Sequence, residues 1–239
     1  MLPPGASSLP HQKTLSKKGR NAMKDLILKE LSNKWTVSER DTSPYHTLKK
    51  SGMKFTISAY EIRGFGSMSV IDMSAMLGLM QMESFILTAE TRDLPLFSGD
   101  FIKAMGKCTL LEEFYDTMID PLPEADLAVY RGVKAKYADL PLYSTEPHWY
   151  DSIRYDFTLG ASDKSLKNRK DEITADYLAA YLKHAEHAPA ADPAQKKAKT
   201  KSYVDGLFSN GGPAVNQFKK LFGETAAREI FEKFVFSCR

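Results

Sequence analysis

Residues 53–62, Met53-Lys-Phe-Thr-Ile-Ser-Ala-Tyr-Glu-Ile62, decide the fold class because apolar and polar side chains alternate along them. Such a period of two predicts a half-buried β-strand. A turn follows at residues 63–66, and the segments 67–76 and 79–89 also have the composition of strands. Consecutive strands joined by short turns predict an antiparallel sheet, and no alternation of strands with helices is visible in this half of the chain.

The rest of the chain contributes helices around this sheet. Residues 101–116 are expected to add one more strand before the chain leaves the sheet, and residues 151–160 to begin either a strand or a helix. Apolar spacing predicts helices at 20–34, near 124–138, at 164–187, at 213–222 and at 224–236. A sheet with helices before and after it belongs to the α+β fold class.

Length and composition restrict the kind of protein. The chain has 239 residues, of which 43% are hydrophobic and 26% charged, as is usual for a globular domain. A net charge of +3 is too small to indicate a nucleic-acid partner by itself. Cys108 and Cys238 provide neither a disulfide framework nor metal-ligand spacing, which favours a reducing, cytoplasmic compartment. No apolar run is long enough for a membrane span, so no membrane partner is expected.

Two segments differ in composition from the rest. Residues 1–22 are rich in Pro, Ser and Lys, and we expect a disordered tail before a single domain at 23–239, with Met23 as an alternative start. The alternative for this tail is a transit peptide, which would place the protein in a plastid. Residues 188–201 are basic and of low complexity, and predict a mobile loop. Their lysines either are simply solvated or meet an acidic electron carrier.

One carboxylate stands out as a catalytic candidate. Asp100 follows Gly99 directly, within Asp93-Leu-Pro-Leu-Phe-Ser-Gly-Asp-Phe-Ile102, and apolar residues lie close on both sides. Pro95 and Gly99 suggest a bend, so Asp100 is expected in a loop or at a strand end. Burial raises the pKa of a carboxyl group, as a proton donor near neutral pH requires.

Two further acids lie in apolar strand segments. Asp72 stands between Ile71 and Met73, and Glu83 lies within the predicted strand 79–89. Each could occupy a polar outer face, because alternate residues of a strand share a face. The competing hypothesis is that neighbouring strands bring Asp72, Glu83 and Asp100 to one cavity, where the acids shift one another's pKa values.

Several segments resemble the ferredoxin-dependent bilin reductases. Leu94-Pro-Leu-Phe-Ser-Gly-Asp100 is similar to the Leu-Pro-Leu-Phe-Gly-x-Asp segment of that family. Residues 218–227 and the ending 234–236 resemble the family's last helices, and Pro147-His148-Trp149 resembles its middle section. The chain looks like a divergent member, related to phycocyanobilin:ferredoxin oxidoreductase and to red chlorophyll catabolite reductase.

The resemblance implies a three-layer α/β/α sandwich with a central antiparallel β-sheet. It also implies an oxidoreductase acting on CH–CH groups of a linear tetrapyrrole (bilin) such as biliverdin, by a radical mechanism. Electrons would arrive singly from reduced ferredoxin, or from flavodoxin, and buried acids would supply protons. No bound cofactor and no metal are expected, and the protein would be a monomer.

The family's site residues transfer to this chain only in part. Asp100 matches the catalytic aspartate. The histidine position of the phycocyanobilin-producing members falls on Glu83, their glutamate position falls on Ile71 beside Asp72, and a second aspartate of other members falls near Gly212. We therefore predict Asp100, Glu83 and Asp72 as the catalytic acids. The substrate-binding candidates are Met68, Met82, Phe97, Asn210 and Phe218. The alternative function is a non-catalytic bilin-binding protein.

Overall fold

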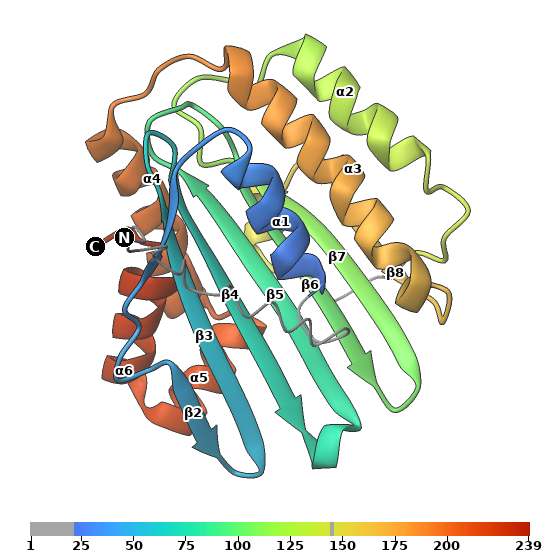
Figure 1. The fold of residues 1–239 in the computed structure, drawn as a ribbon, viewed down its shortest axis with the longest axis vertical. Helices are drawn as coiled ribbons and strands as arrows, with labels where there is room; N and C mark the ends of the chain where they lie inside the picture. The colour runs from blue at the N-terminus through green and yellow to red at the C-terminus, as the bar shows by residue number, and fades with distance from the viewer. Residues whose placement is uncertain (1–21, 144–145) are drawn as a thin grey trace, which may run out of the picture.

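An eight-stranded antiparallel sheet forms the centre of the computed structural model, which describes residues 22–143 and 146–239 (Figure 1). The strand order is β1-β3-β4-β5-β6-β7-β8, and β2 pairs with β3 beside β1. The strands are β1 (Val37–Arg40), β2 (Thr47–Lys50), β3 (Met53–Ile62), β4 (Gly66–Ala75), β5 (Met80–Ala89), β6 (Leu96–Ala104), β7 (Lys107–Tyr115) and β8 (Leu159–Ser162). Every pairing is antiparallel, as the short turns between consecutive strands predicted.

Helices cover both faces of the sheet, so the expected three-layer α/β/α sandwich is confirmed. The near face in Figure 1 carries α1 (Ala22–Ser32), α2 (Glu124–Ala135) and α3 (Leu166–His187). The far face carries α4 (Pro193–Asn210), α5 (Pro213–Phe222), α6 (Glu224–Glu229) and the π-helical segment Ile230–Val235. None of the described helices has the length and apolar character that crossing a membrane requires.

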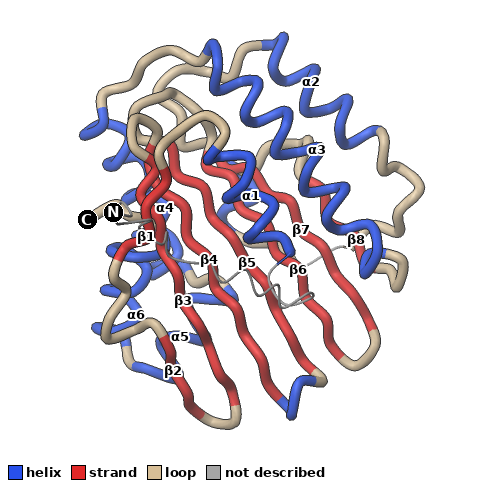
Figure 2. The backbone as a smooth tube through the Cα atoms, viewed as in Figure 1, coloured by secondary structure: helices blue, strands red, loops and turns tan. Residues whose placement is uncertain are grey.

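Each face of the sheet has its own hydrophobic core, because side chains alternate along every strand. On the α1–α3 side, the rings of Phe97 and Phe114 stack with their centroids 4.2 Å apart, and both are fully buried. On the α4–α6 side, Phe55 of β3 packs edge-on against Phe218 of α5 at 5.0 Å. Figure 2 shows how the strands separate these two layers of helices.

The strand predictions hold best for the first hairpins. The strand expected at 53–62 has those bounds, β4 differs from the predicted segment by one residue at each end, and β5 differs by one residue at its start. The single strand expected at 101–116 was wrong: β6 and β7 form a hairpin there, joined at Met105-Gly106. Because β6 already begins at Leu96, Asp100 lies in the middle of a strand and not in a loop or at a strand end.

The mobile loop predicted at 188–201 was also wrong, because α4 begins inside it. The side chain of Asp192 caps this helix by accepting a hydrogen bond from Gln195 N at 2.9 Å, and Pro193 occupies the first turn. The Lys196 ammonium is buried and donates to Asp93, at 3.2 Å, and to two backbone carbonyls. Of the predicted tail, residues 1–21 lie outside the described residues, and Ala22 begins α1.

Candidate active site

Asp100 lies on the face of the sheet that α4, α5 and α6 share. Its direct partners are Ser84 on β5 and Leu111 on β7. Leu96, which is four residues earlier and therefore on the same face, belongs to the core beneath the C-terminal helices. Asp100 itself is half-buried, and the Ser84 hydroxyl donates a hydrogen bond to its Oδ1.

The surroundings of Asp100 favour its neutral form. Burial raises the pKa of Asp100 to about 6, since a charged carboxylate is poorly solvated inside the protein. The hydrogen bond from Ser84 acts in the opposite direction, and the negative charge of Glu113 raises the pKa further. A carboxyl group with a pKa near 6 holds a proton in part of the molecules near neutral pH and can release it.

Glu113 forms an anchored network beside Asp100. On β7 it lies two residues from Leu111, so it faces the same side of the sheet as Asp100. Glu113 Oε1 accepts from the Arg154 guanidinium at 2.9 Å, and Glu113 Oε2 accepts from the Tyr115 hydroxyl at 2.8 Å. Arg154 also pairs with Asp151 at 2.9 Å. The network holds a fixed negative charge near the candidate proton donor.

Aromatic rings enclose this network. Tyr115 contacts Tyr203 of α4, with ring centroids 4.8 Å apart, and Tyr150 edge-on at 5.6 Å. The ring of His148 stacks on Tyr150 at 4.8 Å. Burial raises the pKa of Tyr150 to about 12 and those of Tyr115 and Tyr203 well above their usual value. The three phenols therefore stay protonated at neutral pH and can act as hydrogen-bond donors.

A small cavity lies beside these rings, where α4 ends and α5 begins. It has a volume of about 220 Å³ and is lined by residues 147–149, 210–213 and Asn216. Trp149 donates from Nε1 to Gly211 O at 2.8 Å, which joins the two sides of the cavity. Gly206 makes this approach feasible, because a Cβ there would lie 2.2 Å from the Trp149 ring. Asn210, Asn216 and His148 give the cavity polar walls, and the Trp149 indole gives it a flat aromatic wall.

Asp72 and Glu83 lie on the opposite face of the sheet from Asp100. They are direct partners on β4 and β5, on the face that α1 and α3 cover. Glu83 pairs with Lys170 of α3 at 3.0 Å. Burial raises the pKa of Asp72 to about 6, and the charge of Glu83 adds to this rise. The hypothesis that these two acids share one cavity with Asp100 is therefore wrong, although the two acids do adjoin each other.

The five predicted substrate-binding residues also divide between the faces. Met82 is half-buried on the Asp100 side, Phe218 of α5 is buried there, and Asn210 lines the small cavity. Met68 and Phe97 belong to the fully packed core on the α1–α3 side. The structure thus brings Met82, Asn210 and Phe218 to the side of the sheet on which Asp100 lies.

The sequence interpretation missed the groups that surround Asp100, namely Ser84, Glu113, Tyr115, Arg154 and Tyr203. A usable signal was the pair Glu112-Glu113 in an apolar strand, because alternation sends two consecutive acids to opposite faces. Glu112 is fully buried on the α3 side, where it accepts from the Thr174 hydroxyl at 2.5 Å. Burial raises the pKa of Glu112 to about 8.

The described residues contain no group of three or more His, Cys, Asp or Glu side chains arranged to hold a metal ion. No protein-family model matches the chain, and no curated protein matches it. Among solved structures, the chain is similar to phytochromobilin synthase from tomato, which was crystallised in complex with biliverdin. The TM-score is 0.73 at 16% sequence identity, over 92% of this chain and 83% of the synthase chain. The likeness establishes a common fold.

Proposed function

We propose that this protein reduces a linear tetrapyrrole, with electrons delivered singly by reduced ferredoxin and with Asp100 as a proton donor. The observation that carries the proposal is that Asp100, with a pKa raised to about 6, lies on the face of the sheet that the C-terminal helices cover. The fold shared with a synthase that binds biliverdin supports a bilin as the substrate class.

Asp100 has the properties that such chemistry needs. Reduction of one carbon–carbon double bond takes up two electrons and two protons, so each bond reduced oxidises two one-electron carriers. A bilin that has received a proton accepts an electron more readily. An acid with a pKa of about 6 can give that proton and regain it from water between electron transfers. The Ser84 hydrogen bond stabilises the anion that remains.

The neighbouring side chains suit a flat, partly polar substrate. Met82 and Ile86 are half-buried on the same face as Asp100 and offer an adaptable apolar surface. The phenols of Tyr150 and Tyr203 add hydrogen-bond donors at the end nearer Glu113, whereas the Tyr115 hydroxyl already donates to Glu113. The proposal also includes flavodoxin as an alternative electron donor. It further includes a monomeric protein located in the cytoplasm or in a plastid.

A two-step titration tests this function. Biliverdin is added first, and the visible spectrum reports binding; reduced ferredoxin is then added without oxygen. We expect a coloured complex that changes its spectrum on reduction in the wild type, and Asp100→Asn should bind biliverdin but lose turnover at least 100-fold. Asp120→Asn, which changes an exposed acid in the loop between β7 and α2, is the matched control.

The outcomes separate the alternatives. A coloured complex that does not respond to reduced ferredoxin or flavodoxin would identify a bilin-binding protein without turnover, which the absence of the family's histidine and second aspartate favours. No absorbance change on adding biliverdin would reject the substrate class. Unchanged reduction kinetics in Asp100→Asn would reject the proton donor. Asp72→Asn and Glu83→Gln examine the other two predicted acids, whose position on the opposite face predicts retained turnover.

A further inference from the structure

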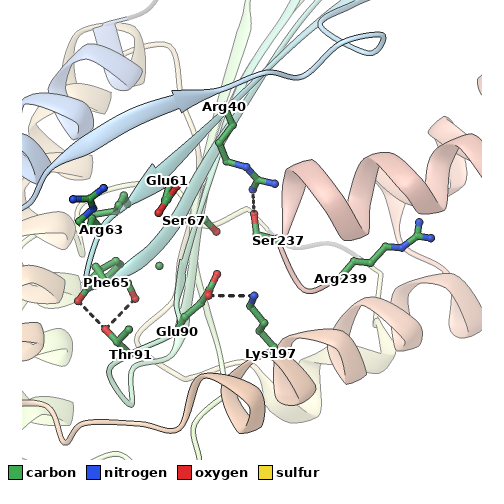
Figure 3. A pocket seen from close by; sticks show the side chains of 13 residues that line it. Arg40, Glu61, Arg63, Phe65, Ser67, Glu90, Thr91, Lys197, Ser237 and Arg239 are labelled. Carbon is green, nitrogen blue, oxygen red and sulfur yellow. Dashed lines mark hydrogen bonds and ion pairs between the residues drawn. The ribbon is translucent and has the colours of Figure 1, made fainter.

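A larger cavity lies apart from Asp100, where β3 turns into β4 at the end of the sheet. It has a volume of about 300 Å³, and none of its lining residues belongs to the network around Asp100 and Glu113. Its walls come from β1, the turn at 63–66, the end of β5, the start of α4 and the C-terminal residues (Figure 3). Segments distant in sequence therefore meet around one space.

Positive charge dominates this cavity. Four cationic side chains line it, and two side-chain carboxylates, those of Glu61 and Glu90, accompany them. The cationic residues are Arg40, Arg63, Lys197 and Arg239. Glu90 already pairs with Lys197 at 3.5 Å. The three arginines then share the cavity with one remaining side-chain carboxylate, that of Glu61.

These arginines lack the carboxylate partners that four other described arginines have. Arg40 is held by neutral groups, donating to Ser237 Oγ at 2.6 Å and to Lys233 O at 3.0 Å. Within residues 22–143 and 146–239, Arg63 and Arg239 make no side-chain hydrogen bond or ion pair. By contrast, a carboxylate pairs with each of Arg131, Arg154, Arg169 and Arg228. Three guanidinium groups without a carboxylate partner thus line this cavity.

The floor of the cavity is held in place by the backbone. Phe65 O accepts from Glu90 N at 2.8 Å and from Thr91 N at 3.1 Å, and the Thr91 hydroxyl donates to Gly64 O at 2.7 Å. Gly66 packs so closely on β5 that a Cβ there would lie 2.1 Å from Thr88 O. Figure 3 shows the hydrogen bonds of Thr91 and Arg40 on the two sides of the cavity. A rigid floor lowers the entropy lost when a ligand binds.

We propose that this cavity binds a phosphate group carried by a small organic molecule. Guanidinium groups match phosphate oxygens with paired, charge-assisted hydrogen bonds, so unpaired arginines around a cavity favour such an anion. A volume of about 300 Å³ exceeds what a single phosphate ion fills and reaches the lower range of small-molecule sites. Glu61 and Ser67 can accept hydrogen bonds from ligand hydroxyls. A sugar phosphate has both properties.

Calorimetric titration of the whole chain tests this site at constant ionic strength, because screening weakens any exposed charge. Glucose 6-phosphate, inorganic phosphate and glucose are the probes. Arg63→Gln combined with Arg239→Gln removes two charges that form no hydrogen bond or ion pair with the described residues, so the fold should be kept. Lys49→Gln combined with Lys50→Gln is the matched control, since both lysines are exposed on β2 and lie outside the cavity.

We expect glucose 6-phosphate to bind more tightly than inorganic phosphate, and glucose to show no binding. The arginine pair should weaken binding at least 10-fold, and the lysine pair should leave the affinity unchanged. If inorganic phosphate bound as tightly as glucose 6-phosphate, the proposal that the ligand has an organic part would be wrong. Absence of phosphate binding, or an equal loss in the lysine pair, would overturn the site. Bilin binding and reduction do not enter this measurement, so it stands apart from the proposed function.

Discussion

Ser84 and Asp100 face each other as direct partners on β5 and β6, and the serine hydroxyl donates to the Asp100 carboxylate. This bond favours the charged acid, whereas burial and the charge of Glu113 favour the neutral one. Because separate residues exert these opposing effects, the protonation of Asp100 can be shifted in either direction by single substitutions.

Ser84→Ala should raise the pKa of Asp100 above about 6, since the substitution removes the donor that stabilises the anion. A hydrogen bond to a charged group contributes about 1.5–3 kcal/mol, so a rise of about one to two pKa units is expected. Carbon-13 NMR of the aspartate carboxyls over a pH series measures it. In the reduction assay, the loss of rate at high pH should move upward; an unchanged or lower pKa would contradict the assigned hydrogen bond.

Glu113→Gln should lower the pKa of Asp100, because it removes a negative charge that opposes ionisation. Glutamine keeps the size of the side chain and can still accept from Arg154 or Tyr115, so the surrounding contacts are largely preserved. The same NMR titration applies. The two substitutions should therefore shift Asp100 in opposite directions, and a shift of the same sign in both would mean that a general structural change dominates.

Gly99→Ala should destabilise the fold by about 2 kcal/mol or more, as overpacking in a core does. A Cβ at Gly99 would lie 2.2 Å from the Phe85 ring and 2.9 Å from Glu112 Oε2. Denaturant unfolding measures the change in free energy of unfolding. Gly132→Ala is the matched control, because its Cβ would meet nothing within 4 Å on helix α2. It should stabilise the protein by about 0.5–1 kcal/mol, and equal losses in both variants would refute the packing argument.

Glu112 should make the folded state less stable as the pH rises. Its pKa in the folded protein is about 8, above the ordinary value of 4.5 that applies when it is unfolded. The stability that Glu112 contributes is therefore full below pH 4.5, falls between 4.5 and 8, and is lost above 8, with a total loss on the order of a few kcal/mol. Denaturant unfolding at several pH values measures this slope. Glu112→Gln should flatten it, and an unchanged slope would show that other groups produce it.

The sequence predicts the sheet well where local pattern is sufficient. The hairpins of β3, β4 and β5 show period-two alternation and short turns, and their bounds follow from these signals. Strand β6 was missed because Pro95 and Gly99 resemble a bend. Gly99 is required instead by the Phe85 ring that crosses it from the neighbouring strand, a contact that no local pattern reveals. Helix α4 was missed because its lysines suggest solvent exposure, whereas Lys196 is buried against Asp93.

The candidate site could be predicted only in part. Asp100 is marked by its apolar neighbours and by the resemblance of its segment to a known family. Which acids share its face depends on strand register, since a shift of one residue sends every side chain to the other side. Asp72 and Glu83 therefore could not be separated from Asp100 in advance. The partners Arg154 and Tyr203 come from distant segments and meet β7 only in the folded chain.

The two carboxyls on opposite faces of the sheet, Asp100 and Glu112, are linked by electrostatics. Glu112 is the direct partner of Gly99, the residue before Asp100, and the charge of Asp100 raises the pKa of Glu112. When Asp100 gains a proton, Glu112 therefore ionises more easily on the other face. The protonation state on one face of the sheet thus affects the pKa of a carboxyl group on the other face. The pKa of Glu112 therefore reports the charge on Asp100 without any coloured ligand.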